Sequence, residues 1–136
     1  IEHGIAVNAP DPNDALGVLA ALGGFDIAGM AGAFLGGAIY RIPVLIDGFI
    51  STVAALLAAR LAPNAIGAMF ASHISAEPAT RLTLDALGVS PLLCAELRLG
   101  EGTGAVAALP LLDMALSVYH GLPTFEALSI EAYQPC

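Results

Sequence analysis

The chain of 136 residues is short of cationic side chains, and it contains no lysine and no tryptophan. Its four arginines stand against 12 acidic residues, which gives a formal net charge of −8 and an isoelectric point near 4.4. The arginines are scattered singly along the sequence, at positions 41, 60, 81 and 98. Because a nucleic-acid backbone is bound by clustered cations, the sequence argues against a nucleic-acid partner.

Charged residues of either sign are also scarce, at 12% of the chain against about a quarter in a typical soluble domain. Hydrophobic residues make up 57%, and the mean hydropathy is +0.82. This composition excludes intrinsic disorder. The length suits one compact domain or a piece of a larger enzyme. With so few solvating side chains, we expect extensive interfaces with other subunits or domains.

No apolar run reaches the roughly 20 residues that a transmembrane helix needs. Charged residues interrupt every long apolar stretch, at positions 26, 41, 47, 60, 77 and 81. The sequence does not begin with a basic and apolar signal peptide, and its two cysteines, Cys94 and Cys136, build no disulfide framework. We therefore expect a cytoplasmic protein without a membrane partner.

Two helices are predicted in the first part of the chain. Asn13 or Asp14 can cap a first helix, which stops at Gly23. A second helix is predicted over 26–40, and its interior holds the glycines Gly29, Gly32 and Gly36. Because each glycine costs a helix up to ~1 kcal/mol, three of them indicate close packing against another backbone.

Short apolar strands alternate with helices in the rest of the sequence. The predicted strands cover 43–48, 66–72 and 92–99. The predicted helices cover 52–61, 78–87 and 105–120, and Gly88 is expected to end the second of them. This alternation is typical of parallel strands joined by right-handed crossovers. The sequence therefore predicts an open parallel α/β sheet layered by helices.

Each predicted strand is followed by polar residues among small ones. Asp47 and Gly48 end the first strand, 72–77 follow the second, and 99–104 follow the third. In open parallel sheets, ligands bind at the carboxyl ends of the strands. The third segment also precedes a helix, whose free backbone N–H groups favour an anion.

The most informative segment is 100–104, where Glu101 stands between glycines. Flanking glycines allow the backbone to approach a ligand and present the carboxylate from a turn, where it can accept a proton from a bound N–H or O–H. The spacing fits neither the P-loop nor the dinucleotide-binding fingerprint. A solvated glutamate in a flexible turn remains the alternative.

Asp47 ends an apolar strand, where an ionised carboxylate needs a partner. That partner is either a ligand hydroxyl, such as that of a ribose, or the helix that begins near Ser51. Ser72 and Ser75 lack a nucleophile elbow, so we expect them to hydrogen-bond a ligand or the turn itself.

A metal site is poorly supported. His73 and Glu77 lie four residues apart, but Pro78 makes a shared helical face improbable. None of the three histidines has a second ligand at a familiar interval.

Four ordered blocks carry a family resemblance. They are Gly-Gly-Phe-Asp-Ile-Ala-Gly-Met-Ala-Gly-Ala-Phe at 23–34, Ile-Pro-Val-Leu-Ile-Asp-Gly-Phe-Ile at 42–50, Ser-His-Ile-Ser-Ala-Glu-Pro at 72–78, and Leu-Arg-Leu-Gly-Glu-Gly-Thr-Gly-Ala at 97–105. In this order they closely resemble the nicotinate-nucleotide:dimethylbenzimidazole phosphoribosyltransferase family. Members of the family are longer, and this sequence resembles their C-terminal portion.

The resemblance implies transfer of the phosphoribosyl group of nicotinate mononucleotide to 5,6-dimethylbenzimidazole, giving α-ribazole 5′-phosphate and nicotinate, a step in assembling the lower ligand of cobalamin. It places Glu101 as the general base and puts Leu99 and Gly100 in the pocket for the acceptor base. Asp47 and Gly48 would meet the ribose, and Ser75 would lie beside the nucleotide or the departing nicotinate. No metal or redox cofactor is implied.

The resemblance also implies an architecture and a partner. It implies a homodimer with an open, doubly wound, Rossmann-like sheet and a small helical domain. Residues 1–104 would belong to the large α/β domain, and 105–136 would form a C-terminal helix and tail that reach the small domain. The part of the family pattern that this sequence lacks includes a phosphate-binding lysine, so the phosphate is left with backbone N–H groups at 102–104. The alternative is a ligand-binding or assembly module without catalysis, which needs a partner chain.

Overall fold

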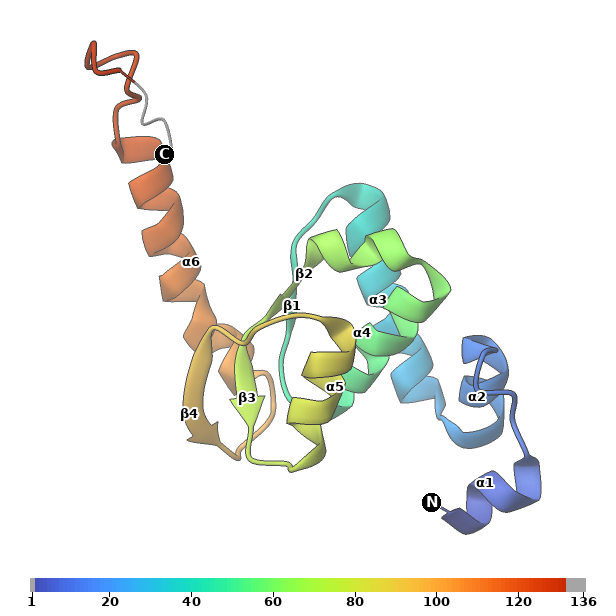
Figure 1. The fold of residues 1–136 in the computed structure, drawn as a ribbon. Helices are drawn as coiled ribbons and strands as arrows, with labels where there is room; N and C mark the ends of the chain where they lie inside the picture. Colours follow the sequence, from blue (N-terminus) through green and yellow to red (C-terminus); the bar gives the residue numbers. More distant parts are fainter. Residues whose placement is uncertain (1, 132–136) are drawn as a thin grey trace.

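The computed structural model describes residues 2–131, and these form a mixed α/β fold (Figure 1). The helices are α1 (Glu2–Asn8), α2 (Ala15–Leu22), α3 (Phe25–Tyr40), α4 (Phe49–Leu61), the 3₁₀ helix η1 (Pro63–Ala68), α5 (Ala79–Leu87) and α6 (Thr103–Gly121). The strands are β1 (Val44–Ile46), β2 (Met69–Ala71), β3 (His73–Ser75) and β4 (Leu93–Leu97). Within these residues no helix combines the length and the apolar content needed to cross a membrane.

Local signals placed most of these elements correctly. The carboxylate of Asp14 accepts a hydrogen bond from the Gly17 N–H at 2.9 Å and so caps α2, which confirms one of the two predicted caps. Gly88 ends α5 at φ 74°, a left-handed conformation that glycine adopts without a steric penalty. The predicted helices at 26–40, 52–61 and 105–120 correspond to α3, α4 and α6.

The predicted strand over 66–72 is wrong in its first part. Pro63 begins the 3₁₀ helix η1, which extends to Ala68, so β2 starts only at Met69. Proline suits this position because its fixed φ and missing N–H favour the first turn of a helix. The short helix α1 was not predicted.

All the described strands pair in parallel, as predicted. β1 pairs with β2 through Val44, Leu45 and Ile46, and β3 pairs with β4. Ser72 joins the two sheets, because its N–H donates to the Ile46 carbonyl and its own carbonyl accepts from the Leu93 N–H. The segment 69–75 therefore lies between β1 and β4, and the carboxyl ends of all these strands point to one edge.

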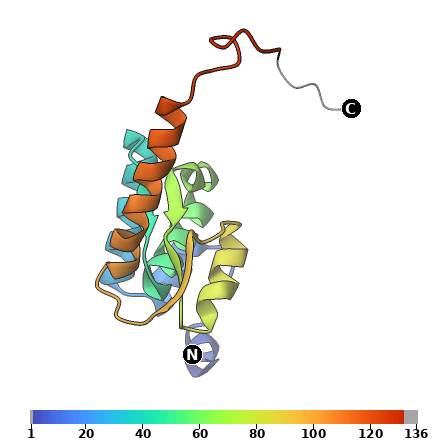
Figure 2. The same ribbon diagram turned by 90° about the vertical axis from the view of Figure 1, so that its left-hand side faces the viewer.

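Helices cover both faces of these strands. Figure 2 shows α5 and α6 on opposite sides of β3 and β4. In Figure 1 the helices α1 and α2 lie at one end of the molecule, while the C-terminal half of α6 projects beyond the body at the other end. The projecting part of α6 exposes several large apolar side chains: Met114, Leu116, Val118 and Tyr119.

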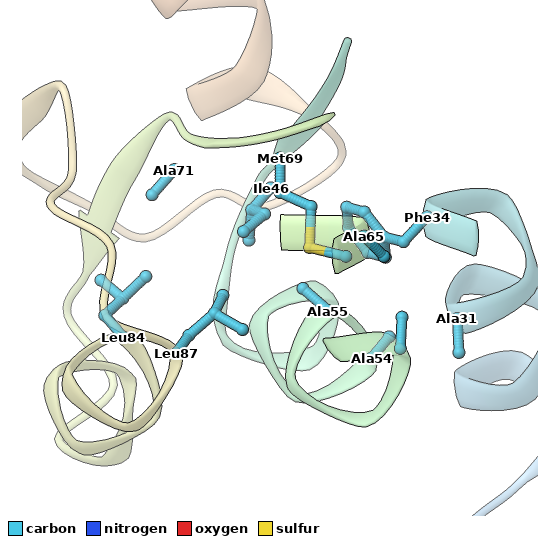
Figure 3. Packing of buried hydrophobic residues seen from close by; sticks show 11 residues of the cluster. Ala31, Phe34, Ile46, Ala54, Ala55, Ala65, Met69, Ala71, Leu84 and Leu87 are labelled. Atoms are coloured by element: carbon cyan, nitrogen blue, oxygen red, sulfur yellow. The ribbon is translucent and has the colours of Figure 1, made fainter. Parts of the chain in front are cut away.

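The core lies between α3, α4, α5 and the strands. Figure 3 shows Phe34 reaching from α3, and Leu84 and Leu87 from α5, toward Ile46 and Met69. Alanines on α4 let these elements approach closely, and Ala54, Ala55 and Ala58 are completely buried. Cys94, which lies in an apolar run of the sequence, is exposed on β4, and Cys136 lies outside the described residues.

The prediction of close backbone packing at Gly29, Gly32 and Gly36 is wrong for the described residues. A Cβ atom built on any of these three glycines would find no atom within 4 Å. The neighbouring Gly37 is the position that packs closely, because a Cβ there would overlap the Val44 side chain and lie 2.8 Å from the Ile42 carbonyl oxygen. The spacing of the glycines along α3 therefore predicted close packing on the wrong face of this helix.

This difference predicts opposite outcomes for two alanine substitutions on α3. Gly37→Ala should lower the free energy of unfolding by roughly 1–2 kcal/mol, because the added methyl group displaces Val44. Gly32→Ala, the matched control, should leave stability unchanged or raise it by up to ~1 kcal/mol through helix propensity. Urea unfolding followed by circular dichroism measures both. Equal effects of the two variants would contradict the packing described for α3.

Candidate active site

A cavity of about 810 Å³ lies at the edge where the parallel strands end. Its walls contain all the residues that the family resemblance assigned to catalysis or substrate binding: Asp47, Gly48, Ser75, Leu99, Gly100 and Glu101. These residues come from segments far apart in the sequence. The parallel pairing brings them together, because it directs the carboxyl ends of β1, β3 and β4 to the same edge.

Ser75 reaches the cavity in a different way from the one predicted. The expected strand ended at Ser72, with Ser75 in the following loop, whereas Ser75 is the last residue of β3 and pairs with Leu97 of β4. Its hydroxyl oxygen accepts a hydrogen bond from the Glu77 N–H at 3.4 Å. The hydroxyl hydrogen of Ser75 is thus free to donate to a ligand.

Glu101 is held in a turn with an unusual backbone. Gly100, Glu101 and Gly102 all have positive φ angles, of 74°, 56° and 76°. The turn is closed by Thr103, whose N–H and hydroxyl both donate to the Gly100 carbonyl, at 3.0 and 2.7 Å. A left-handed conformation is unfavourable for glutamate, and strain of this kind gathers at functional sites. The Glu101 side chain is exposed and lies in the cavity wall.

Asp47 caps a helix, but not the predicted one. Its Oδ1 accepts a hydrogen bond from the Ala105 N–H at 2.9 Å, at the N-terminus of α6, 58 residues away. The helix that follows Asp47, α4, begins after Gly48 without a side-chain cap. Asp47 is half-buried and lines the cavity, so one carboxylate oxygen positions α6 while the other remains available to a ligand.

Ser72 does not line the cavity, but it contacts His73, which does. The buried hydroxyl of Ser72 donates to the Ile46 carbonyl oxygen at 2.6 Å and lies 3.0 Å from His73 Nδ1. Ser72 therefore satisfies a backbone carbonyl of β1, 26 residues away, instead of the turn that follows it. His73 and Glu77 share no helical face, since His73 begins β3 and Glu77 lies in the turn before α5.

The charge of the cavity wall is mainly negative. Its carboxylates are Asp26, Asp47, Glu77 and Glu101, and Arg98 is the one cation among the described residues that line it. Such a wall favours ligands or transition states that carry positive charge. Sequence reasoning missed Arg98, which looked like an isolated charge, and Asp26, which sits in the first turn of α3 after two glycines.

Comparisons with known proteins agree on one family. A family model described as phosphoribosyltransferase matches residues 1–130. The nicotinate-nucleotide--dimethylbenzimidazole phosphoribosyltransferase of Acetivibrio thermocellus is 51% identical over 135 residues, and that of Clostridium acetobutylicum is 49% identical. Each match covers 99% of this chain and 38% of the relative.

A solved structure shares the fold as well. The crystal structure of CobT from Thermus thermophilus aligns with 88% of this chain at a TM-score of 0.78 and 43% identity, and this chain covers 35% of that one. The chain thus spans well under half the length of the relatives that it matches.

Proposed function

The chain belongs to the phosphoribosyltransferase family, and from that premise we propose that its cavity serves the transfer of a phosphoribosyl group from nicotinate mononucleotide to 5,6-dimethylbenzimidazole. One observation carries the proposal. Residues from three separate strand ends, each of which the family resemblance singles out from the sequence, line a single cavity. The relatives named for this reaction supply the choice of donor and acceptor.

In the proposed reaction Glu101 is the general base. One nitrogen of the benzimidazole attacks the anomeric carbon of the donor, and the bond from that carbon to the nicotinate nitrogen breaks. The N–H proton of the azole passes to the Glu101 carboxylate. The benzimidazole ring of the product α-ribazole 5′-phosphate is therefore uncharged. Leu99 and Gly100, which precede Glu101 in the cavity wall, contact the acceptor base.

The negative wall suits the charge changes of this reaction. The glycosylated pyridine ring of the donor is cationic, and transfer of its ribose develops oxocarbenium character. Asp47 and Gly48 hold the ribose, and the Asp47 carboxylate stabilises this positive charge. Ser75 donates to the nucleotide or to the departing nicotinate.

The expected site of the donor phosphate, at the backbone N–H groups of 102–104, is revised. The Thr103 and Ala105 N–H groups are already bonded, and the Asp47 carboxylate occupies the N-terminus of α6. An anion at the backbone of 102–104 would therefore face Asp47. We assign the anionic groups of the donor to the side of the cavity that carries Arg98.

The whole protein is proposed to have the architecture of its relatives. Its large domain would contain residues 1–104 in an open, doubly wound sheet, and α6 with the following tail would reach a small helical domain in a homodimer. The exposed apolar side chains on the projecting half of α6 support this assignment, because a surface of that kind is stabilised when another element covers it. Residues 132–136 of the tail lie outside the described residues.

Asp47→Asn is expected to lower turnover far more than it weakens binding of nicotinate mononucleotide. The amide oxygen of asparagine can still accept from the Ala105 N–H, so α6 stays in place, while the charge that stabilises the transition state is lost. We expect a loss in kcat of about a hundredfold and a change in KM within threefold. Asp14→Asn is the matched control, because Asp14 also caps a helix but does not line the cavity. An equal loss in kcat for both variants would contradict the electrostatic role of Asp47.

The function itself is tested by pairing two measurements on the unmodified protein. Calorimetric titration with 5,6-dimethylbenzimidazole reports binding, and chromatographic detection of α-ribazole 5′-phosphate reports turnover. Binding together with product formation supports the proposal. Binding of the azole without product supports a module that lacks catalysis, and the absence of both overturns the assigned acceptor.

A further inference from the structure

His73 is a buried polar residue that the proposed mechanism does not use. It is the first residue of β3, its side chain is 5% exposed, and it lines the cavity. Its imidazole lies directly against the backbone of Gly104, where a Cβ atom would overlap the ring. The ring is therefore fixed between the strand and the first turn of α6.

The hydrogen bonds of Ser72 determine which ring nitrogen carries the proton. The Ser72 hydroxyl has one hydrogen, and it points to the Ile46 carbonyl oxygen, because two oxygens only 2.6 Å apart require a hydrogen between them. The same hydroxyl lies 3.0 Å from His73 Nδ1, so it must accept there and Nδ1 must donate. In the neutral imidazole this leaves a lone pair on Nε2.

Nε2 has no hydrogen-bond partner among residues 2–131, although the side chain is almost completely buried. Among these residues only Thr80 Oγ1 is a fully buried side-chain atom without a partner, so His73 Nε2 keeps accessible surface that a hydrogen-bond donor in the cavity can reach. We propose that His73 Nε2 accepts a hydrogen bond from a ribose hydroxyl of the phosphoribosyl donor. This inference rests on the proposed function and adds to it a residue that holds the donor sugar.

The surroundings of His73 favour the sugar over the azole. The Ser72 hydroxyl that holds the ring also lies 3.5 Å from the Asp47 carbonyl oxygen, which places His73 beside the residue proposed to meet the ribose. Asp47 and His73 then offer two neighbouring acceptors, which match the two hydroxyl donors of a ribose 2′,3′-diol. The azole N–H has its own acceptor in Glu101, on the turn that follows β4.

Two substitutions of His73 distinguish the roles of its two ring nitrogens in a binding experiment. The amide of His73→Gln reaches the position of Nε2, whereas the amide of His73→Asn reaches only that of Nδ1. With nicotinate mononucleotide as the probe, calorimetry should show about tenfold weaker binding for His73→Asn and a change within twofold for His73→Gln. Binding of 5,6-dimethylbenzimidazole should change in neither variant, which also verifies that both fold.

A deoxygenated donor adds a thermodynamic cycle. The unmodified protein should bind 2′-deoxy and 3′-deoxy nicotinate mononucleotide each about tenfold more weakly than the parent compound. With the analogue that lacks the hydroxyl bound by His73, His73→Asn should lose nothing further, since the two changes remove one hydrogen bond. Additive losses with both analogues would overturn the assignment of a ribose hydroxyl to His73.

The protonation of the ring is measured without any ligand. Two-bond ¹H–¹⁵N spectra distinguish the two tautomers, and the two other histidines, His3 and His120, are exposed references. We expect the proton of His73 on Nδ1, and a shift toward Nε2 in Ser72→Ala. A proton on Nε2 in the unmodified protein would overturn the inference alone. Failure of the unmodified protein to bind nicotinate mononucleotide would overturn the proposed function and the hydroxyl assignment together.

Discussion

Glu101→Gln should reduce the rate of phosphoribosyl transfer by about a thousandfold, the loss typical when a general base is removed. Glutamine has nearly the shape of glutamate, so the substrates still bind, but its amide cannot take the azole proton. The side chain is exposed, which means that the fold loses no buried contact. Single-turnover formation of α-ribazole 5′-phosphate measures the effect, and calorimetry with 5,6-dimethylbenzimidazole should show binding within a few-fold of normal.

Glu96 offers a closely matched control for this experiment. It lies on β4, five positions before Glu101 in the sequence, and it too is exposed and has a positive φ, of 48° against 56°. Glu96 does not line the cavity. Glu96→Gln should therefore leave the rate unchanged. A comparable loss in both variants would show that the loss of a negative charge from this segment, and not proton transfer by Glu101, explains the result.

The elements predicted correctly are those decided by neighbouring residues. Asp14 caps the helix that starts next to it, Gly88 ends the helix just before it, and the alternation of strands and helices implies parallel pairing. The two helix ends depend on interactions within a few residues, and the parallel pairing depends on the order of strands and helices along the chain. The convergence of the strand ends then follows from topology, which is why the sequence could bring the candidate site residues together.

The features that were missed depend on contacts between different elements of the fold. Asp47 caps α6 and not α4, because the fold places the N-terminus of α6 beside it, although Ala105 lies 58 residues further along the chain. The glycine that packs closely on α3 was decided by where β1 crosses it, at Val44. A pattern of residue types along one helix contains neither piece of information, because many faces have glycines and only the tertiary fold selects one.

Gly104→Ala is expected to lower the free energy of unfolding by about 3 kcal/mol, at the upper end for overpacking. In an isolated helix the same change would add up to ~1 kcal/mol of stability. Here the new methyl group would overlap the imidazole of His73, which Ser72 holds in place. Denaturant unfolding measures the loss. Gly121→Ala, at the other end of the same helix and with open space around its Cβ position, should not be destabilising.

The source of the destabilisation can be isolated with a double substitution. If the clash with the imidazole is responsible, Gly104→Ala should cost much less in a His73→Ala background than in the unmodified protein, because the space for the methyl group is then open. Turnover should fall in Gly104→Ala as well, since displacement of the first turn of α6 breaks the bond between Ala105 and Asp47 and shifts the turn that carries Glu101. Purely additive costs would mean that Gly104 is required for its backbone alone, and that His73 does not hold the N-terminus of α6 in the way the structure shows.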